Sequence, residues 1–357
     1  MMNKQIYFLV RRAFYSMQCK GHDTDSAWKH VASKCKLIPR YPVKLQYIKY
    51  AAILFLFISV GIYIWYQQHS HLPSKPTTGI IKPSYSNAEL ILANGQRILL
   101  KKSQEHISVK ELGVQILQDS TNHLLYKADS SVPLLSDTIF NQLKTSKGGE
   151  YSLKLPDGSQ VYLNSESTLQ FPVHFAVEKR EVFLQGEAFF EITKNENAPF
   201  IVHLEERKVI VLGTRFNVSA YPEDPSLQIT LVEGKVAIQT QEDEKILQPS
   251  EQYILNNISG DIKIIPVDTA LYTSWLQGKF YFKNYRLEDI VKKLERWYDF
   301  KISYQQEKIK EMYFRGVINK HHPLEEVLRN LEATTNIAFD INGKNIVVKK
   351  RNNNKKE

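Results

Sequence analysis

An uncharged apolar run from Tyr50 to Tyr66 is the feature that most constrains how this chain can fold. The run has no charged residue and no proline, and as a helix its 17 residues reach about 25 Å, slightly less than the apolar thickness of a bilayer. Tyr47 extends it at one end, Lys49 can reach the headgroups, and aromatic residues flank both ends. A buried helix of a soluble protein is the alternative, but such a helix normally carries a polar face. The run therefore predicts a transmembrane helix over residues 47–67.

The charge on the two sides of this run predicts its orientation. Residues 1–49 contain ten lysines and arginines and two acids, a net charge of +8, whereas the residues after Tyr66 contribute only +1 to the overall +9. Basic segments stay in the cytoplasm, so we expect a basic cytoplasmic arm over residues 1–46 and export of the C-terminal 291 residues. Nucleic-acid binding by the arm is the alternative, but no DNA-binding pattern accompanies the charge, and we expect no direct contact with nucleic acid.

Processing and cysteine usage agree with this topology. No small-x-small cleavage site follows the apolar run, so we expect it to remain as an anchor rather than to be removed as a signal peptide. Both cysteines, Cys19 and Cys35, precede the run, and the exported part has none. Without disulfides, the exported part must be stabilised by a packed apolar core.

The exported part begins with short alternating strands. A proline-containing spacer over residues 68–84 leads into residues 85–268, where segments such as 208–212 and 214–220 alternate apolar and polar residues between turn signals. The pairs Asn94-Gly95 and Asp157-Gly158 each lie between two such segments and predict hairpins, because glycine accepts a positive φ. The pattern predicts a mainly β protein, with an all-β domain that is a sandwich or a β-helix-like stack.

The period changes in residues 272–349. Apolar residues at 287, 290, 291, 294 and 297 follow helical spacing, and a similar pattern recurs 37 residues later, from Leu324 to Glu332. Short strands precede and follow each helical segment. We expect a small α+β domain of two related halves, followed by a disordered tail over residues 350–357.

Five ordered motifs in the exported part resemble those of FecR-like transmembrane anti-sigma factors. Residues 272–349 look like the short N-terminal domains of secretins and TonB-dependent receptors, and the resemblance covers roughly residues 85 to 350. The motifs are Gly148-Gly149-Glu150-Tyr151 with Leu155-Pro156-Asp157-Gly158-Ser159 and Leu163-Asn164, then Leu184-Gln185-Gly186-Glu187-Ala188-Phe189-Phe190-Glu191-Ile192, Pro199-Phe200-Ile201-Val202, Leu212-Gly213-Thr214-Arg215-Phe216-Asn217-Val218 and Val232-Glu233-Gly234-Lys235-Val236.

The resemblance implies a role in signalling. Such proteins are single-pass proteins of the inner membrane, with a cytoplasmic N-terminus that holds an extracytoplasmic-function sigma factor and a periplasmic C-terminus. The periplasmic part receives a signal from the N-terminal signalling domain of an outer-membrane TonB-dependent transporter, and the output is transcription of a nutrient-uptake locus for an iron-siderophore or a glycan. An intramembrane protease is a further partner of such proteins. The alternative is a membrane-anchored periplasmic glycan-binding or envelope-structural protein without sigma control.

The cytoplasmic arm is shorter than the helical domain usual in relatives of this architecture. Residues 24–34 resemble only the membrane-proximal end of that domain. Trp28, Val31 and Ala32 would form one apolar stripe on a short helix and are the candidate sigma-binding residues. A juxtamembrane linker is the other interpretation, because an isolated helix this short is marginal.

One bond is a candidate for single-turnover chemistry in a chain that we otherwise expect not to be an enzyme. In some relatives the chain cleaves itself at a Gly-Thr bond in the motif matched by Gly213-Thr214, through attack of the threonine hydroxyl on the preceding carbonyl. The other interpretation is structural: a glycine at the start of a strand followed by a β-favouring threonine. The sequence assigns no general base for the cleavage.

No cofactor or metal site is expected. The pairs His69/His71 and His321/His322 lack the further ligands of a zinc site, and no phosphate-binding loop or nucleophile elbow is present in the sequence.

Overall fold

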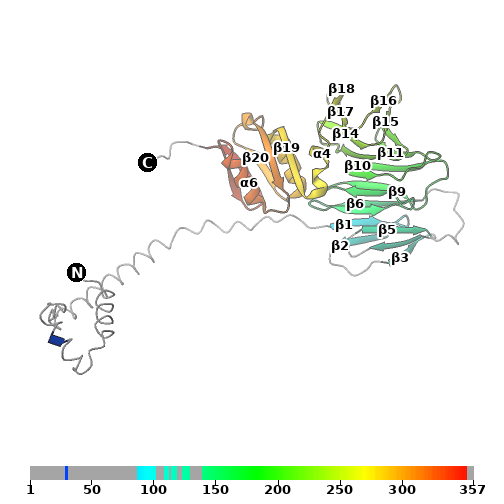
Figure 1. Ribbon diagram of the computed structural model, residues 1–357, viewed down its shortest axis with the longest axis horizontal. Helices are drawn as coiled ribbons and strands as arrows, with labels where there is room; N and C mark the ends of the chain where they lie inside the picture. Colours follow the sequence, from blue (N-terminus) through cyan, green and yellow to red (C-terminus); the bar gives the residue numbers. More distant parts are fainter. Residues whose placement is uncertain are drawn as a thin grey trace, which may run out of the picture. The chain divides into compact units, whose positions relative to one another are not determined.

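The computed structural model describes residues 29–30, 87–101, 108–111, 114–118, 123–128 and 139–351, which are coloured in Figure 1. The predicted transmembrane helix, the spacer and the predicted tail after Arg351 lie outside the described residues, as does the arm except Lys29 and His30. Across the described ranges, no helix combines the length and apolar character needed to cross a membrane. The described residues from Asn87 to Arg351 belong to one compact unit.

Two long β-sheets form the first part of this unit, here called the β domain. The first sheet contains, in spatial order, β2 (Arg97–Lys101), β1 (Asn87–Ile91), β6 (Phe140–Thr145), β9 (Thr168–Pro172), β10 (Arg180–Glu191), β11 (Phe200–Leu204), β12 (Arg207–Val211), β15 (Val236–Gln239) and β16 (Glu244–Leu247). The second contains β3 (Ser108–Glu111), β4 (Val114–Gln118), β5 (His123–Ala128), β7 (Tyr151–Lys154), β8 (Gln160–Leu163), β10 again, β13 (Arg215–Ala220), β14 (Ser226–Glu233), β17 (Glu251–Asn256) and β18 (Ile262–Pro266).

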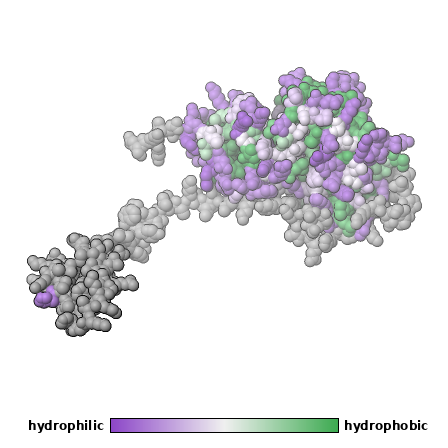
Figure 2. All heavy atoms as spheres, in the orientation of Figure 1, coloured by the Kyte–Doolittle hydropathy of each residue, from purple (hydrophilic) through white to green (hydrophobic). Residues whose placement is uncertain are grey.

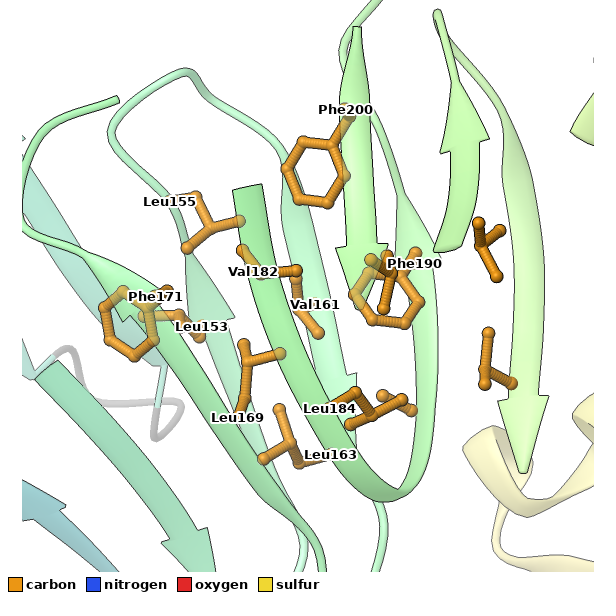
Figure 3. Close-up of a cluster of buried hydrophobic side chains, with 14 of the residues drawn as sticks. Leu153, Leu155, Val161, Leu163, Leu169, Phe171, Val182, Leu184, Phe190 and Phe200 are labelled. Carbon is orange, nitrogen blue, oxygen red and sulfur yellow. The ribbon is translucent and has the colours of Figure 1, made fainter. Parts of the chain in front are cut away.

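The chain visits the two sheets in turn and advances along both. Strand numbers run in nearly the same order along each sheet, from β1–β5 at one end to β15–β18 at the other (Figure 1). One apolar cluster with side chains from both sheets fills the interior, including Leu153, Phe171, Val182 and Phe190 (Figure 3). The all-β prediction is therefore confirmed, and the arrangement has the facing sheets of a sandwich and the progressive order of a β-helix-like stack.

Both predicted hairpins are present. Gly95 and Gly158 have φ values of +84° and +86°, in the region that glycine adopts without steric cost. In the turn between β1 and β2, the N–H group of Leu92 donates to the Gln96 carbonyl and the N–H group of Gly95 donates to the Leu92 carbonyl. In the turn between β7 and β8, Leu155 donates in the same way to Ser159, and Gly158 donates to Leu155. Local turn chemistry therefore sets the register of these strand pairs.

Strand β10 belongs to both sheets, and Gly186 is the point of change. Up to Gln185 the strand pairs with β9, and from Gly186 onward it pairs with β13. Gly186 has a φ of +100°, and a Cβ atom there would lie 2.5 Å from the Ser167 hydroxyl oxygen. Only glycine can occupy this position, because the backbone turns from one sheet to the other while in close contact with Ser167.

The second part of the unit, the C-terminal domain, follows the predicted change of period. Its elements are α4 (Ala270–Thr273), η1 (Ser274–Gln277), β19 (Lys279–Arg286), α5 (Leu287–Trp297), β20 (Lys301–Tyr304), η2 (Glu307–Ile309), β21 (Tyr313–Asn319), α6 (Leu324–Ala333), β22 (Ile337–Asn342) and β23 (Asn345–Lys350). The five apolar positions predicted to form the inner face of α5 are all buried, and Leu324, Val327 and Leu331 of α6 are buried as well.

Strand pairing in the C-terminal domain relates its two strand–helix–strand segments. The first strands of the segments, β19 and β21, pair antiparallel with each other. The second strands, β20 and β22, lie on either side of β23, parallel and antiparallel to it respectively. A separate apolar cluster fills this domain. Figure 2 shows hydrophilic residues over most of the visible described surface, with smaller hydrophobic patches between them.

Candidate functional site

The residues predicted for self-cleavage lie between β12 and β13. A Cβ atom on Gly213 would lie 2.6 Å from the Cα atom of Lys194, so any larger residue would require the backbone to move. Thr214 is buried, and its hydroxyl donates a hydrogen bond to the Lys235 carbonyl at 2.9 Å. The hydroxyl proton is thus engaged with a backbone acceptor.

Gly234 contacts the same two residues from the neighbouring loop. Its φ is +93°, and a Cβ atom there would lie 2.8 Å from the Gly213 carbonyl oxygen and 2.9 Å from the Thr214 hydroxyl oxygen. The motifs at residues 212–218 and 232–236 therefore pass each other in close backbone contact, here called the Gly213–Thr214 crossing. Within the described ranges, no carboxylate, imidazole or amine is hydrogen-bonded to the Thr214 hydroxyl. Self-cleavage at the Gly213–Thr214 bond stays a prediction.

The other sequence-predicted residues are not brought to this crossing. Trp28, Val31 and Ala32 lie outside the described residues. His321 is exposed, and Nδ1 of His322 lies 2.7 Å from the carboxylate of Glu326. Over the described ranges, no group of three histidine, cysteine or acidic side chains is arranged to hold a metal ion.

A larger polar cluster joins the β domain to the C-terminal domain and is here called the interdomain contact. Its centre is Arg296 of α5, which is only 8% exposed. The guanidinium donates hydrogen bonds to Asp224 at 2.6 Å and to Glu223 at 2.9 Å, and it lies 3.7 Å from the centre of the Tyr221 ring. Burial opposes the charge on Arg296, but the hydrogen bond to Asp224, together with Tyr221 and Glu223, raises its pKa above the ordinary value. The cation is therefore held firmly by the β domain.

A chain of amide hydrogen bonds forms the second part of the interdomain contact. The Trp275 indole nitrogen donates to the Asn217 side-chain oxygen at 3.1 Å, and the Asn217 amide nitrogen donates to the Glu187 carboxylate at 2.9 Å. The Asn164 amide nitrogen donates to the other oxygen of Glu187 at 2.8 Å. One carboxylate in the β domain thus orients the amide that receives the tryptophan of the C-terminal domain.

Lys320 forms the third part. It is 1% exposed, and its ammonium contacts the Glu150 carboxylate and lies 4.4 Å from the centre of the Trp297 ring. Burial lowers the pKa of Lys320 even though Glu150 acts in the opposite direction. The N–H group of Gly148, two residues before Glu150, donates a backbone hydrogen bond of 2.8 Å to the carbonyl of Arg296, which directly precedes Trp297. The contact therefore involves main chain as well as side chains.

Several residues of the interdomain contact belong to the sequence motifs, which predicted no role for them. Glu150, Asn164, Glu187 and Asn217 all lie inside the motifs that carried the resemblance. The available signal was a polar residue at the centre of an apolar strand, as for Asn217 between Phe216 and Val218. A single sequence does not say which partner such a residue meets. In the structure these motif residues converge on the surface that receives the C-terminal domain.

Two family patterns match the chain over these regions. Residues 141–237 match the family described as FecR protein, and residues 279–348 match the family described as FecR, C-terminal. The acidic and amide residues of the interdomain contact lie within the first match, and Arg296 and Lys320 lie within the second. No curated protein matches the chain.

Solved structures extend the comparison. The chain is similar to a proposed anti-sigma factor from Parabacteroides distasonis ATCC 8503, whose crystal structure at 1.65 Å resolution has 33% sequence identity and a TM-score of 0.56, with coverage of 59% of this chain and 99% of that one. A second crystal structure with the same description, at 2.50 Å resolution, also has 33% identity and a TM-score of 0.56, with coverage of 60% and 100%. The similarity thus spans nearly the whole of each solved chain. The present chain therefore belongs to the FecR family.

Proposed function

We propose that the chain is a single-pass inner-membrane regulator of an extracytoplasmic-function sigma factor. Membership of the FecR family, together with the similarity to solved proteins described as proposed anti-sigma factors, is the observation that carries the proposal. The basic arm of residues 1–46 would hold the sigma factor in the cytoplasm, with Trp28, Val31 and Ala32 as its apolar contacts. The run at residues 47–67 would be the membrane anchor, and its positive-inside flank supports this orientation.

The periplasmic part would receive its signal from the N-terminal signalling domain of an outer-membrane TonB-dependent transporter. The interdomain contact supports this part of the proposal. Arg296, Trp275 and Lys320 attach the C-terminal domain to the β domain, so a displacement of one domain would be transmitted to the other through these contacts. Binding of the transporter domain would therefore change the state of the whole periplasmic part. Cleavage within the apolar run by an intramembrane protease would then release the arm and permit transcription of the uptake locus.

Co-purification tests sigma binding. The full-length chain, tagged at its C-terminus, is co-expressed with each extracytoplasmic-function sigma factor of its host, and the retained sigma factor is quantified. We expect retention of one sigma factor by the intact chain and loss of retention by the double variant Trp28→Ala, Val31→Asp. The matched control is Lys29→Gln, on the same segment but outside the apolar stripe.

The outcomes separate the proposal from its alternative. Retention that depends on Trp28 and Val31 supports sigma control. Failure of the intact chain to retain any sigma factor would contradict it and would favour an anchored periplasmic protein without a cytoplasmic partner.

A further inference from the structure

A cleft of about 370 Å³ opens between the β domain and the C-terminal domain, beside the interdomain contact. Its floor is formed by β14 and β17 of the second sheet, through Gln228 and Gln252, and its opposite wall by β19 and α5, through Tyr285 and Lys293. A volume of this size lies within the range of small-molecule sites in proteins. A smaller pocket of about 40 Å³ shares part of the same lining, including Gln252 and Lys293.

One buried side chain in the lining of the cleft has a polar atom without a protein partner. Gln252 is 1% exposed, and its amide nitrogen donates to the Thr230 hydroxyl at 2.9 Å, whereas its side-chain oxygen has no hydrogen-bond partner. Buried polar atoms in native proteins are nearly always hydrogen-bonded. The oxygen of Gln252 is therefore an acceptor suited to an O–H or N–H donor of a ligand.

The cleft also carries two lysines without ion pairs. Arg286 and Arg296 in its lining are paired with Asp289 and Asp224, but over the described ranges no carboxylate lies within 4.0 Å of the ammonium of Lys292 or Lys293. The Lys293 ammonium instead lies 5.2 Å from the centre of the Tyr285 ring. Burial alone would lower the pKa of Lys293, but its surroundings, which include Tyr285 and Glu187, raise it, so the group remains charged.

The rim of the cleft is shaped by a β-bulge in β19. The register between β19 and β21 shifts between Lys283 and Tyr285, and the residue between them, Asn284, has a φ of +60°. Bulges commonly redirect side chains at binding sites. Here the bulge places Asn284 and Tyr285 in the lining, where Tyr272 and Tyr313 add further aromatic surface.

We infer that this cleft binds a small acidic polyhydroxylated ligand, of the size of a sugar acid. Its carboxylate would pair with Lys292 and Lys293, one of its hydroxyl groups would donate to the Gln252 oxygen, and its C–H face would lie against the tyrosine rings. A neutral sugar lacks the group that the lysines require, and a simple carboxylate lacks the donor that Gln252 requires. This inference goes beyond the proposed function, because binding in the cleft does not depend on a sigma factor.

Isothermal titration calorimetry of the purified full-length chain with glucuronate tests the inference. We expect saturable binding of glucuronate, and binding of glucose and of acetate that is at least about tenfold weaker. Lys293→Gln, which removes the charge at similar length, should weaken glucuronate binding by about tenfold. Lys301→Gln, an exposed lysine of β20 outside the cleft, is the matched control and should bind as the unaltered chain does.

Specific results would overturn the inference. They are the absence of saturable glucuronate binding up to about 10 mM, equal binding of glucose and glucuronate, or unchanged affinity in both Lys293→Gln and Lys292→Gln. Thermal unfolding of each variant without ligand shows that it is folded, so a loss of binding by a folded variant supports the site. Because no sigma factor takes part, a negative result here leaves the proposed function unaffected, and a failed co-purification leaves this inference unaffected.

Discussion

The interior of the β domain and the interdomain contact are built from different chemistry. The interior is an almost continuous set of leucine, valine, isoleucine and phenylalanine side chains, many of them fully buried. The interdomain contact is centred on an arginine, a lysine, two amides and four carboxylates. Apolar burial is non-directional and roughly proportional to area, whereas ion pairs and amide hydrogen bonds require one relative orientation.

This difference separates stability from orientation. Loss of an apolar side chain should destabilise one domain, whereas loss of an interdomain hydrogen bond should release one domain from the other while both remain folded. Interfaces between domains are usually more polar than domain interiors and are correspondingly easier to open. A signalling protein needs such a boundary, because the signal must change the contact without unfolding the chain.

The largest expected effect is in the β-domain interior. Phe190 is fully buried, stacks on Phe216 with ring centres 5.0 Å apart, and lies near Phe200. Phe190→Ala should lower the free energy of unfolding by about 3–5 kcal/mol, measured by denaturant titration, because it leaves a cavity. The control Val177→Ala, at a residue that is 84% exposed, should change it by less than about 0.5 kcal/mol. Equal effects for both variants would contradict the assignment of Phe190 to the apolar interior.

A buried ion pair inside the β domain tests whether the loss of a buried charge partner lowers the free energy of unfolding as much as the loss of an apolar side chain does. The Arg180 guanidinium, 3% exposed, donates to the Asp157 carboxylate at 2.7 Å, and Asp157 also accepts from Ser159. Asp157→Ala should cost about 3 kcal/mol of unfolding free energy, because it leaves a buried cation that is bonded to the Ala198 and Thr193 carbonyls but has no carboxylate to neutralise it. Glu196→Ala removes the partner of the exposed Lys194 and should have a much smaller effect, because solvent screens that pair. A small loss for Asp157→Ala would show that water or another group satisfies Arg180.

The interdomain contact should respond differently. A double-mutant cycle of Arg296→Met and Asp224→Ala should give a coupling energy of about 1–3 kcal/mol. In both variants the amide hydrogen of Gly148, which is bonded to the Arg296 carbonyl, should exchange faster, while amides of β10 remain protected. Exchange that accelerates equally in β10 would show that the contact holds the β domain itself together.

The Gly213–Thr214 crossing should have a smaller effect on stability. Thr214→Val removes the hydrogen bond to the Lys235 carbonyl and should cost about 1–2 kcal/mol. A denaturing gel examines the same residue for chemistry. Self-cleavage would give two fragments of the unaltered chain and one band for Thr214→Ala, whereas a single full-length band for the unaltered chain would exclude cleavage and leave the structural role.

The smallest expected effect is a pH dependence from Lys320. Its pKa is lower in the folded chain than the ordinary 10.5, so between these two values the unfolded chain binds more protons. The contribution of Lys320 to stability should therefore increase as the pH rises through that window. The difference in unfolding free energy between the unaltered chain and Lys320→Met, measured at about pH 8 and about pH 10, should shift in favour of the unaltered chain at the higher pH. A shift in the opposite direction would mean that Glu150 outweighs burial.

Local sequence signals predicted the elements of the fold well. The Asn94-Gly95 and Asp157-Gly158 turns formed as expected because a positive φ at glycine is a property of the turn itself. The helix at Leu287–Trp297 was predicted from its apolar period, since one inner face is enough to define it.

Contacts between residues far apart in the sequence could not be predicted from such local signals. The alternation of the chain between two sheets depends on pairings between strands far apart in sequence, and the crossing at Gly186 depends on Ser167. The interdomain contact also depends on pairs of residues that are far apart in the sequence. Asn217 meets Trp275 and Arg296 meets Asp224 only because the two domains dock, and a single sequence contains no record of which polar residues face each other across that surface.

Strand β10 gives the molecule a mechanical property. The uninterrupted strand β10 runs through both sheets and changes from one to the other at Gly186. The next residue, Glu187, holds the Asn217 amide that receives Trp275. A pull on the C-terminal domain is therefore applied close to a strand that both sheets share, rather than to a loop at the periphery. Tension is distributed over many backbone hydrogen bonds loaded together, so the tether to the C-terminal domain should yield before the β domain does.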